Sequence, residues 1–288
     1  MPSGILIIDK PAGWTSMDVC AKLRGILGER RVGHGGTLDP MATGVLPVFV
    51  GSATKAVEFA EKGDKEYVAG LRLGMVTNTQ DSTGEVLEER AVSVDRGALE
   101  AVLPRFTGPI QQVPPMFSAI KRDGKKLYEL ARKGREVHRD PRPVTIHTLE
   151  VLEQTGPDRF LLRVRCSKGT YVRTLCHDIG QALGCGGCMD ELRRTMAAGF
   201  TLEDAVTLEQ VQEQGEALLM PVDCFFAGCP VFLLTSPRME RMARNGSPVP
   251  APGLKPGQYR VYSREKEFLC LSRYEDGALR SIKNFFGG

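Results

Sequence analysis

The sequence has no long hydrophobic run, and its net charge is close to zero. No stretch reaches the roughly 20 apolar residues of a membrane-spanning helix. The N-terminal residues MPSGILIIDKP also lack the basic region and the long apolar core of a secretory signal. We therefore expect a cytoplasmic protein without membrane contact. The formal charge of +3 is too small to indicate nucleic-acid binding by itself.

The eight cysteines do not predict a disulfide framework, because they are spread through a long chain of cytosolic type. Cys185 and Cys188 have the spacing of half a zinc or redox site, with Cys166, Cys176 and His177 upstream. The pattern places Cys166 on the inward face of a strand and Cys176 on the apolar stripe of a helix. Packing accounts for both, so we predict that the chain holds no metal.

Alternating and helical hydrophobic patterns follow one another irregularly along the chain. Residues 65–74 and 160–166 alternate as strands, whereas 172–183 has a helical stripe that Gly184 ends. Residues 16–27 predict another helix, with Ser16 as its N-cap and Gly28 as its stop. Half-exposed strands among helices favour an α+β fold, with a mixed, mainly antiparallel sheet flanked by helices.

The pattern of the sequence changes near residue 230. From there to the C-terminus, short strand patterns alternate with turns rich in Asn, Gly and Pro. A chain of 288 residues commonly forms one large domain and a smaller one. We predict a catalytic or binding domain at 1–229 and a small β-barrel at 230–288.

One segment is distinctly basic. Residues 121–143 carry nine Lys and Arg against four Asp and Glu, a local charge of +5 that exceeds the excess of the whole chain. Such an element on a near-neutral protein is typical of a phosphate-binding surface. A solvated face with ordinary charge mixing is the alternative.

The stretch GHGGTLDPMATGVLPV, residues 33–48, gathers four glycines around Asp39. Pro40 disfavours helical geometry at Asp39, and glycines allow another molecule to approach the main chain closely. With an ordinary pKa near ~3.9, this carboxylate would be ionised and available as a nucleophile. An Asp-Pro turn without catalytic function has the same pattern.

Several other side chains could share a site with Asp39. His34 lies five residues upstream, and Tyr67 and Tyr171 are aromatic groups of the kind that stack on nucleobases. If the turn that carries Arg173 faces Asp39, the guanidinium and the carboxylate would pair. Hydrogen bonding in a loop, for His34, and packing in a core, for the tyrosines, are the alternatives.

Five segments together resemble, in order and spacing, the bacterial tRNA pseudouridine-55 synthases of the TruB family. They are DKPAGWTS, GHGGTLDPMATGVLPV, KEYVAGLRLG, QQVPPMFSAIKRDGKKLYELARKG and CSKGTYVRTLCHDIGQALG. The resemblance implies a pseudouridine synthase fold with a C-terminal PUA-like RNA-binding domain. It also implies that uridine 55 of the tRNA T loop is flipped into a pocket and isomerised.

The resemblance assigns roles to individual residues. It implies that Asp39 is the nucleophile, that Arg173 pairs with it, and that Tyr67 stacks on the flipped base and assists removal of the C5 proton. Further residues are implied to contact substrate (His34, Tyr171, Leu192, Lys10) or the RNA backbone of the T stem-loop (Lys121, Lys125, Lys126, Arg132, Arg135). Lys10 and its neighbour Pro11 fit a structural role better.

The resemblance leaves some points open. Asp39 could attack the sugar C1′, attack the base, or promote a glycal intermediate. Asn78 stands where the family usually has Asp, which puts one loop contact in doubt. We expect a monomer that needs no cofactor and no obligate protein partner. A non-catalytic RNA-binding protein is the main rival interpretation.

Overall fold

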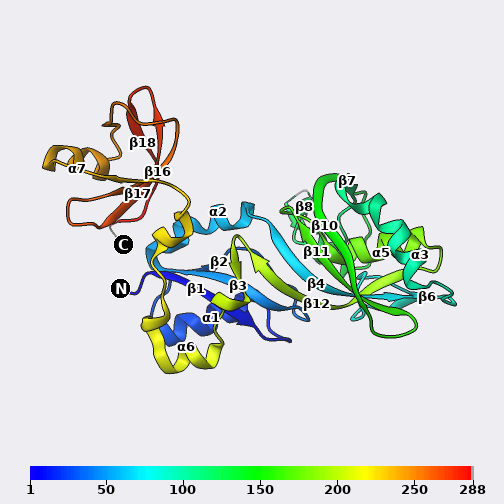
Figure 1. Cartoon of the computed structure of the whole chain (residues 1–288). Coiled ribbons are helices and arrows are strands. Elements are labelled where there is room, and N and C mark those ends of the chain that lie inside the picture. The colour runs from blue at the N-terminus through cyan, green and yellow to red at the C-terminus, as the bar shows by residue number, and fades with distance from the viewer. Residues whose placement is uncertain (123, 287–288) are drawn as a thin grey trace.

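A nine-stranded sheet forms the body of the protein (Figure 1). The structure, a computed structural model, describes residues 1–122 and 124–286; one position of the basic segment and the last two residues lie outside this range. The strands follow the order β1 (Gly4–Lys10), β3 (Thr43–Val50), β12 (Gly187–Ala197), β4 (Lys65–Leu73), β11 (Arg159–Cys166), β10 (Arg142–Gln154) and β7 (Gly108–Gln112), with β2 (Val32–His34) beside β3 and β13 (Phe200–Thr201) beside β12.

Strand β12 joins two halves of this sheet. It runs parallel to β3 through the pairs Arg193–Thr43 and Arg194–Gly44, and antiparallel to β4 on its other side. The remaining pairings within the sheet are antiparallel. The prediction of a mixed, mainly antiparallel sheet is therefore confirmed.

The alternating patterns of β4 and β11 fold as predicted. Phe160, Leu162 and Val164 are buried, whereas Arg163 and Arg165 face solvent. Together with β12, these strands supply a large part of a core that α5 covers. Burial of one face explains the strict period of two.

Helices flank the sheet. In α1 the N-cap is Thr15, not Ser16: Thr15 forms a capping box with Asp18, and Ser16 instead donates to the Leu38 carbonyl. Gly28 ends α1 in the left-handed conformation, as predicted. The helical elements of this part are α1 (Ser16–Leu27), η1 (Gly51–Ala56), α2 (Val57–Lys62), α3 (Arg96–Val102), η2 (Leu103–Phe106), α5 (Val172–Ala182), η3 (Leu202–Asp204), α6 (Leu208–Gln214), η4 (Gly215–Leu218) and η5 (Val222–Phe226).

Two small hairpins extend from the body. One joins β5 (Met75–Thr77) to β6 (Val86–Glu89), and the other joins β8 (Lys121–Arg122) to β9 (Lys125–Lys126). A single short helix, α4 (Leu127–Ala131), follows the second hairpin. The basic segment is thus a hairpin and a helical turn on the surface.

A second sheet of five strands occupies the C-terminal region, beside the β1 end of the body (Figure 1). Its order is β14 (Val231–Leu233), β16 (Gly257–Tyr262), β17 (Phe268–Glu275), β18 (Ala278–Asn284) and β15 (Val249–Pro250). The sequence reading missed helix α7 (Pro237–Arg244), which Ser236 caps and whose Ala243 is buried.

Candidate active site

Asp39 lies in the loop between β2 and β3, at the middle of the large sheet. Its carbonyl accepts a hydrogen bond from the Ala42 amide at 3.0 Å, which closes a turn just before β3. Its side chain remains 36 % exposed. The loop thus presents a carboxylate that another molecule can reach.

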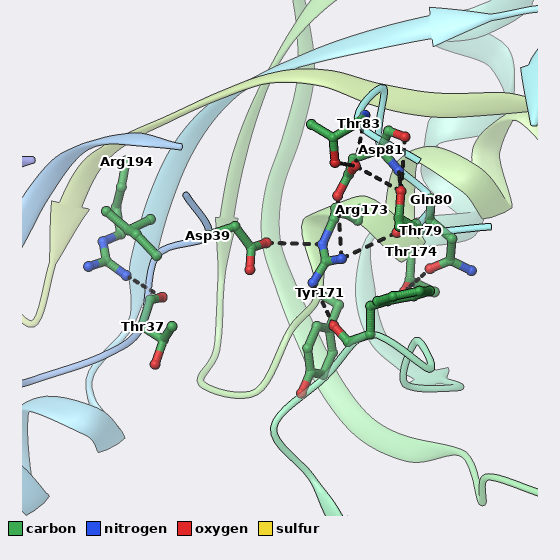
Figure 2. A network of polar contacts seen from close by, with 12 residues as sticks. Thr37, Asp39, Thr79, Gln80, Asp81, Thr83, Tyr171, Arg173, Thr174 and Arg194 are labelled. Carbon is green, nitrogen blue, oxygen red and sulfur yellow. Dashed lines mark hydrogen bonds and ion pairs between the residues drawn. The ribbon is translucent and has the colours of Figure 1, made fainter. Parts of the chain in front are cut away.

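Arg173 meets this carboxylate from the other half of the sheet. It stands in the first turn of α5, and its Nε lies 3.0 Å from Oδ2 of Asp39 (Figure 2). The guanidinium is 8 % exposed and also donates to the Thr79 and Phe117 carbonyls, at 3.2 and 3.1 Å. The pairing expected from the sequence is present, and it is held in a nearly buried setting where charge-assisted bonds are strong.

A second carboxylate completes the network, and sequence reasoning missed it. Oδ2 of Asp81 lies 3.4 Å from Nη1 of Arg173. Its Oδ1 accepts hydrogen bonds from the Thr79 hydroxyl and from the amide and hydroxyl of Thr83 (Figure 2). In the polar run TNTQDSTGE, this aspartate has no pattern that separates it from an ordinary turn residue.

The environment of Asp39 alters its proton affinity. Burial raises the pKa of the Asp39 carboxyl, and the nearby Asp81 charge adds to the rise. Arg173 and, more weakly, Lys10 oppose it. The expectation of an ordinary pKa at Asp39 is therefore wrong, because the sequence pattern does not reveal how far the loop is desolvated.

Two residues of the sheet line the core beneath this loop. Tyr67 on β4 is 8 % exposed, and Leu192 on β12 is 6 % exposed. Both belong to the same hydrophobic cluster as Leu38. Burial also raises the pKa of Tyr67, so its hydroxyl stays protonated at neutral pH. The structure thus places these two predicted residues next to the Asp39 loop.

Tyr171 is fixed through its backbone. Its amide donates to the side-chain oxygen of Gln112 at 2.8 Å, and its carbonyl accepts from the amide group of the same residue at 3.0 Å. The ring is half-buried, and burial raises the pKa of its hydroxyl. Figure 2 shows Tyr171 beside Arg173.

Lys10 lies entirely inside the protein. Its ammonium group donates to the carbonyls of Pro11, Trp14 and Pro40, at 2.9, 2.6 and 3.3 Å. These bonds tie the end of β1 to the loop of Asp39 and leave no exposed surface for a substrate contact. Burial lowers the pKa of Lys10 to about 8.

His34 lies at the end of β2 and pairs in register with Val48. Burial lowers the pKa of its imidazole, with a smaller contribution from the Arg194 charge. Its Nδ1 is buried without a hydrogen-bond partner among residues 1–122 and 124–286. The imidazole is therefore neutral at physiological pH.

The predicted RNA-backbone residues gather apart from Asp39. Lys121, Lys125, Arg132 and Arg135 are exposed on the basic segment, and Lys126 is half-exposed. A cleft of about 340 Å³ runs from this segment to the loop of Asn78 and Gln80 and includes Phe117, whose carbonyl holds Arg173. The cleft thus connects Arg135 and Arg139 of the basic segment with the residues that surround Arg173.

Comparison with known families shows which family the chain belongs to. Residues 24–172 match a family model described as TruB family pseudouridylate synthase (N terminal domain), and residues 173–225 match tRNA pseudouridylate synthase B C-terminal domain. The chain belongs to the TruB family. Within it, a protein of Cupriavidus metallidurans named tRNA pseudouridine synthase B is 45% identical over 290 residues, covering 96% of this chain and 92% of that protein. A protein of the same name from Stutzerimonas stutzeri is 46% identical, covering 96% and 93%.

Solved structures agree with this TruB assignment. A Cbf5-Nop10-Gar1 complex contains a chain with a TM-score of 0.75 and 28% identity, covering 98% of this chain and 85% of that one. An H/ACA RNP bound to a substrate RNA containing 2'-deoxyuridine gives 0.73 and 27%, with coverage of 99% and 85%. The pseudouridine synthase fold expected from the sequence is confirmed.

The two TruB matches meet inside the site. Their boundary falls between Val172 and Arg173, so Asp39 and Tyr67 belong to the first match, and Arg173 and Leu192 to the second. Because β12 lies between β3 and β4, the two stretches share one sheet. The Asp39–Arg173 pair therefore forms only when both parts fold together.

Three further expectations concern the cysteines, a possible membrane-spanning helix and Asn78. Cys185 and Cys188 are buried and free, and no group of three or more potential metal ligands occurs in the described part of the chain. Among the helices described, none has the length and apolar character needed to cross a membrane. Asn78 bonds with Glu85 rather than with Arg173.

Proposed function

We propose that this chain is an isomerase that converts uridine 55 in the T loop of tRNA to pseudouridine. The observation that carries the proposal is the reachable Asp39 carboxylate, held at 3.0 Å by a nearly buried Arg173. Membership of the TruB family and relatives named tRNA pseudouridine synthase B supply the substrate class.

The chemistry fits a single available carboxylate. The bond from uracil N1 to the sugar C1′ breaks, a bond from C5 to C1′ forms, C5 loses a proton and N1 gains one. Substrate and product are isomers, so no water is added and no redox cofactor is required. Glycosidases that add water use two carboxylates. Here Asp81 is committed to Arg173, Thr79 and Thr83, and Asp39 is left to act as the nucleophile.

The base must leave its stack before it can react, and base flipping is the general solution. In the proposal, the Tyr67 ring stacks on the flipped uracil and its hydroxyl assists removal of the C5 proton. Tyr171 and Leu192 complete the pocket, and neutral His34 contacts the T loop during flipping. Arg173 keeps Asp39 ionised in spite of its burial.

The grip on tRNA is assigned to two regions. The basic segment 121–143 binds the T arm through phosphate contacts, in which each cation releases a condensed counterion. We further propose that 1–229 is the catalytic domain and that 230–288, with its five-stranded sheet, is a PUA-like RNA-binding domain. The solved relative bound to a substrate RNA supports RNA as the substrate. The enzyme acts as a monomer.

The Asp39→Asn variant tests the proposed nucleophile. Asparagine has nearly the same shape but carries no charge, so we expect native folding and tRNA binding. The rate of pseudouridine formation should fall by at least roughly 10³-fold. The measurement is single-turnover conversion of an unmodified tRNA transcript, with the product located by chemical mapping of pseudouridine.

Asp158→Asn is the matched control, because Asp158 is also about one-third exposed and also lies beside an arginine, Arg72. It should react at the wild-type rate. Product at wild-type levels with Asp39→Asn would remove the nucleophile assignment. If the wild-type protein binds tRNA but forms no pseudouridine, the non-catalytic RNA-binding interpretation is correct.

A further inference from the structure

Arg194 is the largest side chain that the described structure buries completely, at 1 % exposure. Within residues 1–122 and 124–286, its guanidinium donates to backbone carbonyls alone: Val45 at 2.7 Å, Gly36 at 3.1 Å and Thr37 at 3.4 Å. Among the described residues no carboxylate lies within ion-pair distance of it. Figure 2 shows the bond from Arg194 to Thr37, two residues before Asp39. The protein thus keeps a full positive charge in its interior without neutralising it.

The position of Arg194 in the sheet is equally specific. It lies on β12 where the two halves join, opposite Gly44 of β3 and opposite Tyr67 of β4. Gly44 has a φ of +98°, and a Cβ there would lie 2.2 Å from the Arg194 carbonyl. The close approach of β3 and β12 therefore fixes the backbone of Arg194, while three carbonyls fix its guanidinium.

A buried, unneutralised cation is costly unless something in its surroundings uses the charge. The Arg194 charge also lowers the pKa of its cationic neighbours Lys10, Lys65 and His34. Joining the carbonyls of β3 and of the loop before it needs only neutral donors, so this repulsion would be avoidable if bridging were the sole role. The group that the Arg194 charge can stabilise is the phenol of Tyr67, which lies opposite Arg194 on the neighbouring strand β4.

We propose that Arg194 is a positioning residue for Tyr67: its fixed guanidinium orients the Tyr67 hydroxyl toward the flipped base and stabilises negative charge on that oxygen during proton transfer. The proposal rests on the function proposed above and deepens it. Arg194 itself touches neither uracil nor sugar. It acts on the reaction through Tyr67.

The electrostatics of Tyr67 agree with this geometry. Burial raises the pKa of Tyr67, and the charge of Arg194, which lies opposite it in the sheet, is the main effect that opposes the rise. Asp39 and Cys166 act in the opposite direction. Without Arg194, the Tyr67 oxygen would be surrounded by groups that disfavour negative charge.

The step concerned is loss of the C5 proton after C5 has bonded to C1′. The Tyr67 hydroxyl gives its own proton to N1, and the resulting phenolate oxygen takes the proton from C5. The electrons of the C5–H bond become the C5=C6 double bond, and those of the C6=N1 bond return to N1. No external oxidant or reductant takes part. If the Tyr67 phenolate forms less readily, this step becomes slower, whereas cleavage of the N1–C1′ bond is unaffected.

The test uses the full-length protein and tRNA transcripts with hydrogen or deuterium at C5 of the target uridine. For Arg194→Met we expect native circular dichroism, a tRNA Kd within about threefold of wild type, and a single-turnover rate reduced roughly 10- to 100-fold. We also expect a larger deuterium isotope effect than in the wild type. A purely structural role would lower the amplitude or the affinity but would leave the isotope effect unchanged.

Arg194→Lys keeps the charge and should recover part of the lost rate and lower the isotope effect again. Arg193→Met is the control on the same strand, since the Arg193 guanidinium pairs with Asp9 instead. If Arg194→Met does not fold, the rate and isotope effect of Arg194→Lys against wild type decide the question in the same way.

Two outcomes separate this inference from the proposed function. If wild-type protein forms no pseudouridine, the proposed function fails. If the wild type is active and the Arg194 variants fold, bind tRNA and show either the wild-type rate or an unchanged isotope effect, the positioning role alone is overturned.

Discussion

Asp39 and Asp81 share one guanidinium but differ in what else they contact. The Asp81 side chain is 6 % exposed and accepts hydrogen bonds from Thr79 and Thr83. Asp39 is 36 % exposed and, in the part of the chain that the structure describes, has Arg173 as its one ion-pair partner. Asp81 therefore holds the arginine, and the arginine holds Asp39. The partly exposed Asp39 carboxylate is therefore the one that is available to react.

Replacing Asp81 by Asn removes one of the two charges that balance Arg173. The amide keeps the shape of the side chain, but the nearly buried guanidinium loses a partner and is less firmly placed at Asp39. We expect the free energy of unfolding to fall by about 1–3 kcal/mol. The single-turnover rate should drop roughly 10- to 100-fold with tRNA affinity retained. Urea unfolding and single-turnover assays measure the two effects. A wild-type rate would show that Arg173 is positioned without Asp81.

Lys10 makes stability depend on pH in a defined direction. Its pKa is about 8 in the folded protein against an ordinary value of 10.5, so between these values the unfolded chain binds the extra proton. The free energy of unfolding therefore rises with pH through this window, and the contribution is lost as pH falls through 8. Relative to Lys10→Met, the wild type should gain on the order of 2 kcal/mol from pH 7.5 to 10.5. Urea titrations at several pH values measure this, and parallel curves for the two proteins would contradict it.

The sequence predicts the site residues that belong to a recognisable motif. It does not predict those whose contacts form only when distant segments fold together. Asp39, Tyr67 and Arg173 could be named because each belongs to a segment with a family resemblance. Asp81 and Arg194 could not, because their partners lie on other strands and across loops. Which distant residues come to lie opposite one another is decided when the protein folds, and it leaves no pattern in the sequence around either residue.

Elements with strong periodicity were predictable. Strands β4 and β11 and helix α5 bury one face each, so their patterns give both the type and the inward side. The insertion of β12 between β3 and β4 was not predictable, because strand order is set by tertiary packing. Helix α7 was missed because half of its residues are charged and few of its positions are buried.

The basic hairpin and α4 are the element on which tRNA binding is predicted to depend. Lys125 is exposed, while Lys126 lies over the Tyr128 ring, at 5.4 Å from its centroid. Replacing both by Glu should weaken tRNA binding. It should also reduce the slope of log K against log salt by roughly 1–2, since each lost phosphate contact removes about one released counterion. Filter binding between low and high salt measures the slope.

A charge-matched control is the double variant Lys22→Glu and Arg30→Glu. Both positions are exposed, on α1 and just after it. This variant changes the net charge equally but touches no predicted phosphate contact. If both double variants shift the slope alike, the basic segment is an ordinary solvated surface.

At the scale of the whole molecule, the two sheets are joined by an aromatic cluster. Phe226 of η5 contacts Phe59 of α2 on one side, and Phe268 of β17 and Phe285, which follows β18, on the other. Lys283 adds an ion pair to Glu58, at 2.5 Å. Buried aromatic contacts of this kind transmit strain, so the predicted boundary near residue 229 separates two cores that are packed together.

Phe226→Ala should weaken this junction and uncouple the two parts. Removing the ring leaves a cavity beside its aromatic neighbours and should cost about 3–5 kcal/mol. The single tryptophan, Trp14, packs against the core of α1 and β1, so its fluorescence reports unfolding of the large sheet alone. Circular dichroism reports both sheets. In the wild type the two signals should change together as urea is added. In Phe226→Ala the circular dichroism should change first, because the C-terminal sheet unfolds alone.

The control is Phe160→Leu, inside the core of the large sheet, which should lower the free energy of unfolding while the two signals stay coincident. Coincident transitions in Phe226→Ala as well would mean that contacts other than this cluster couple the two sheets.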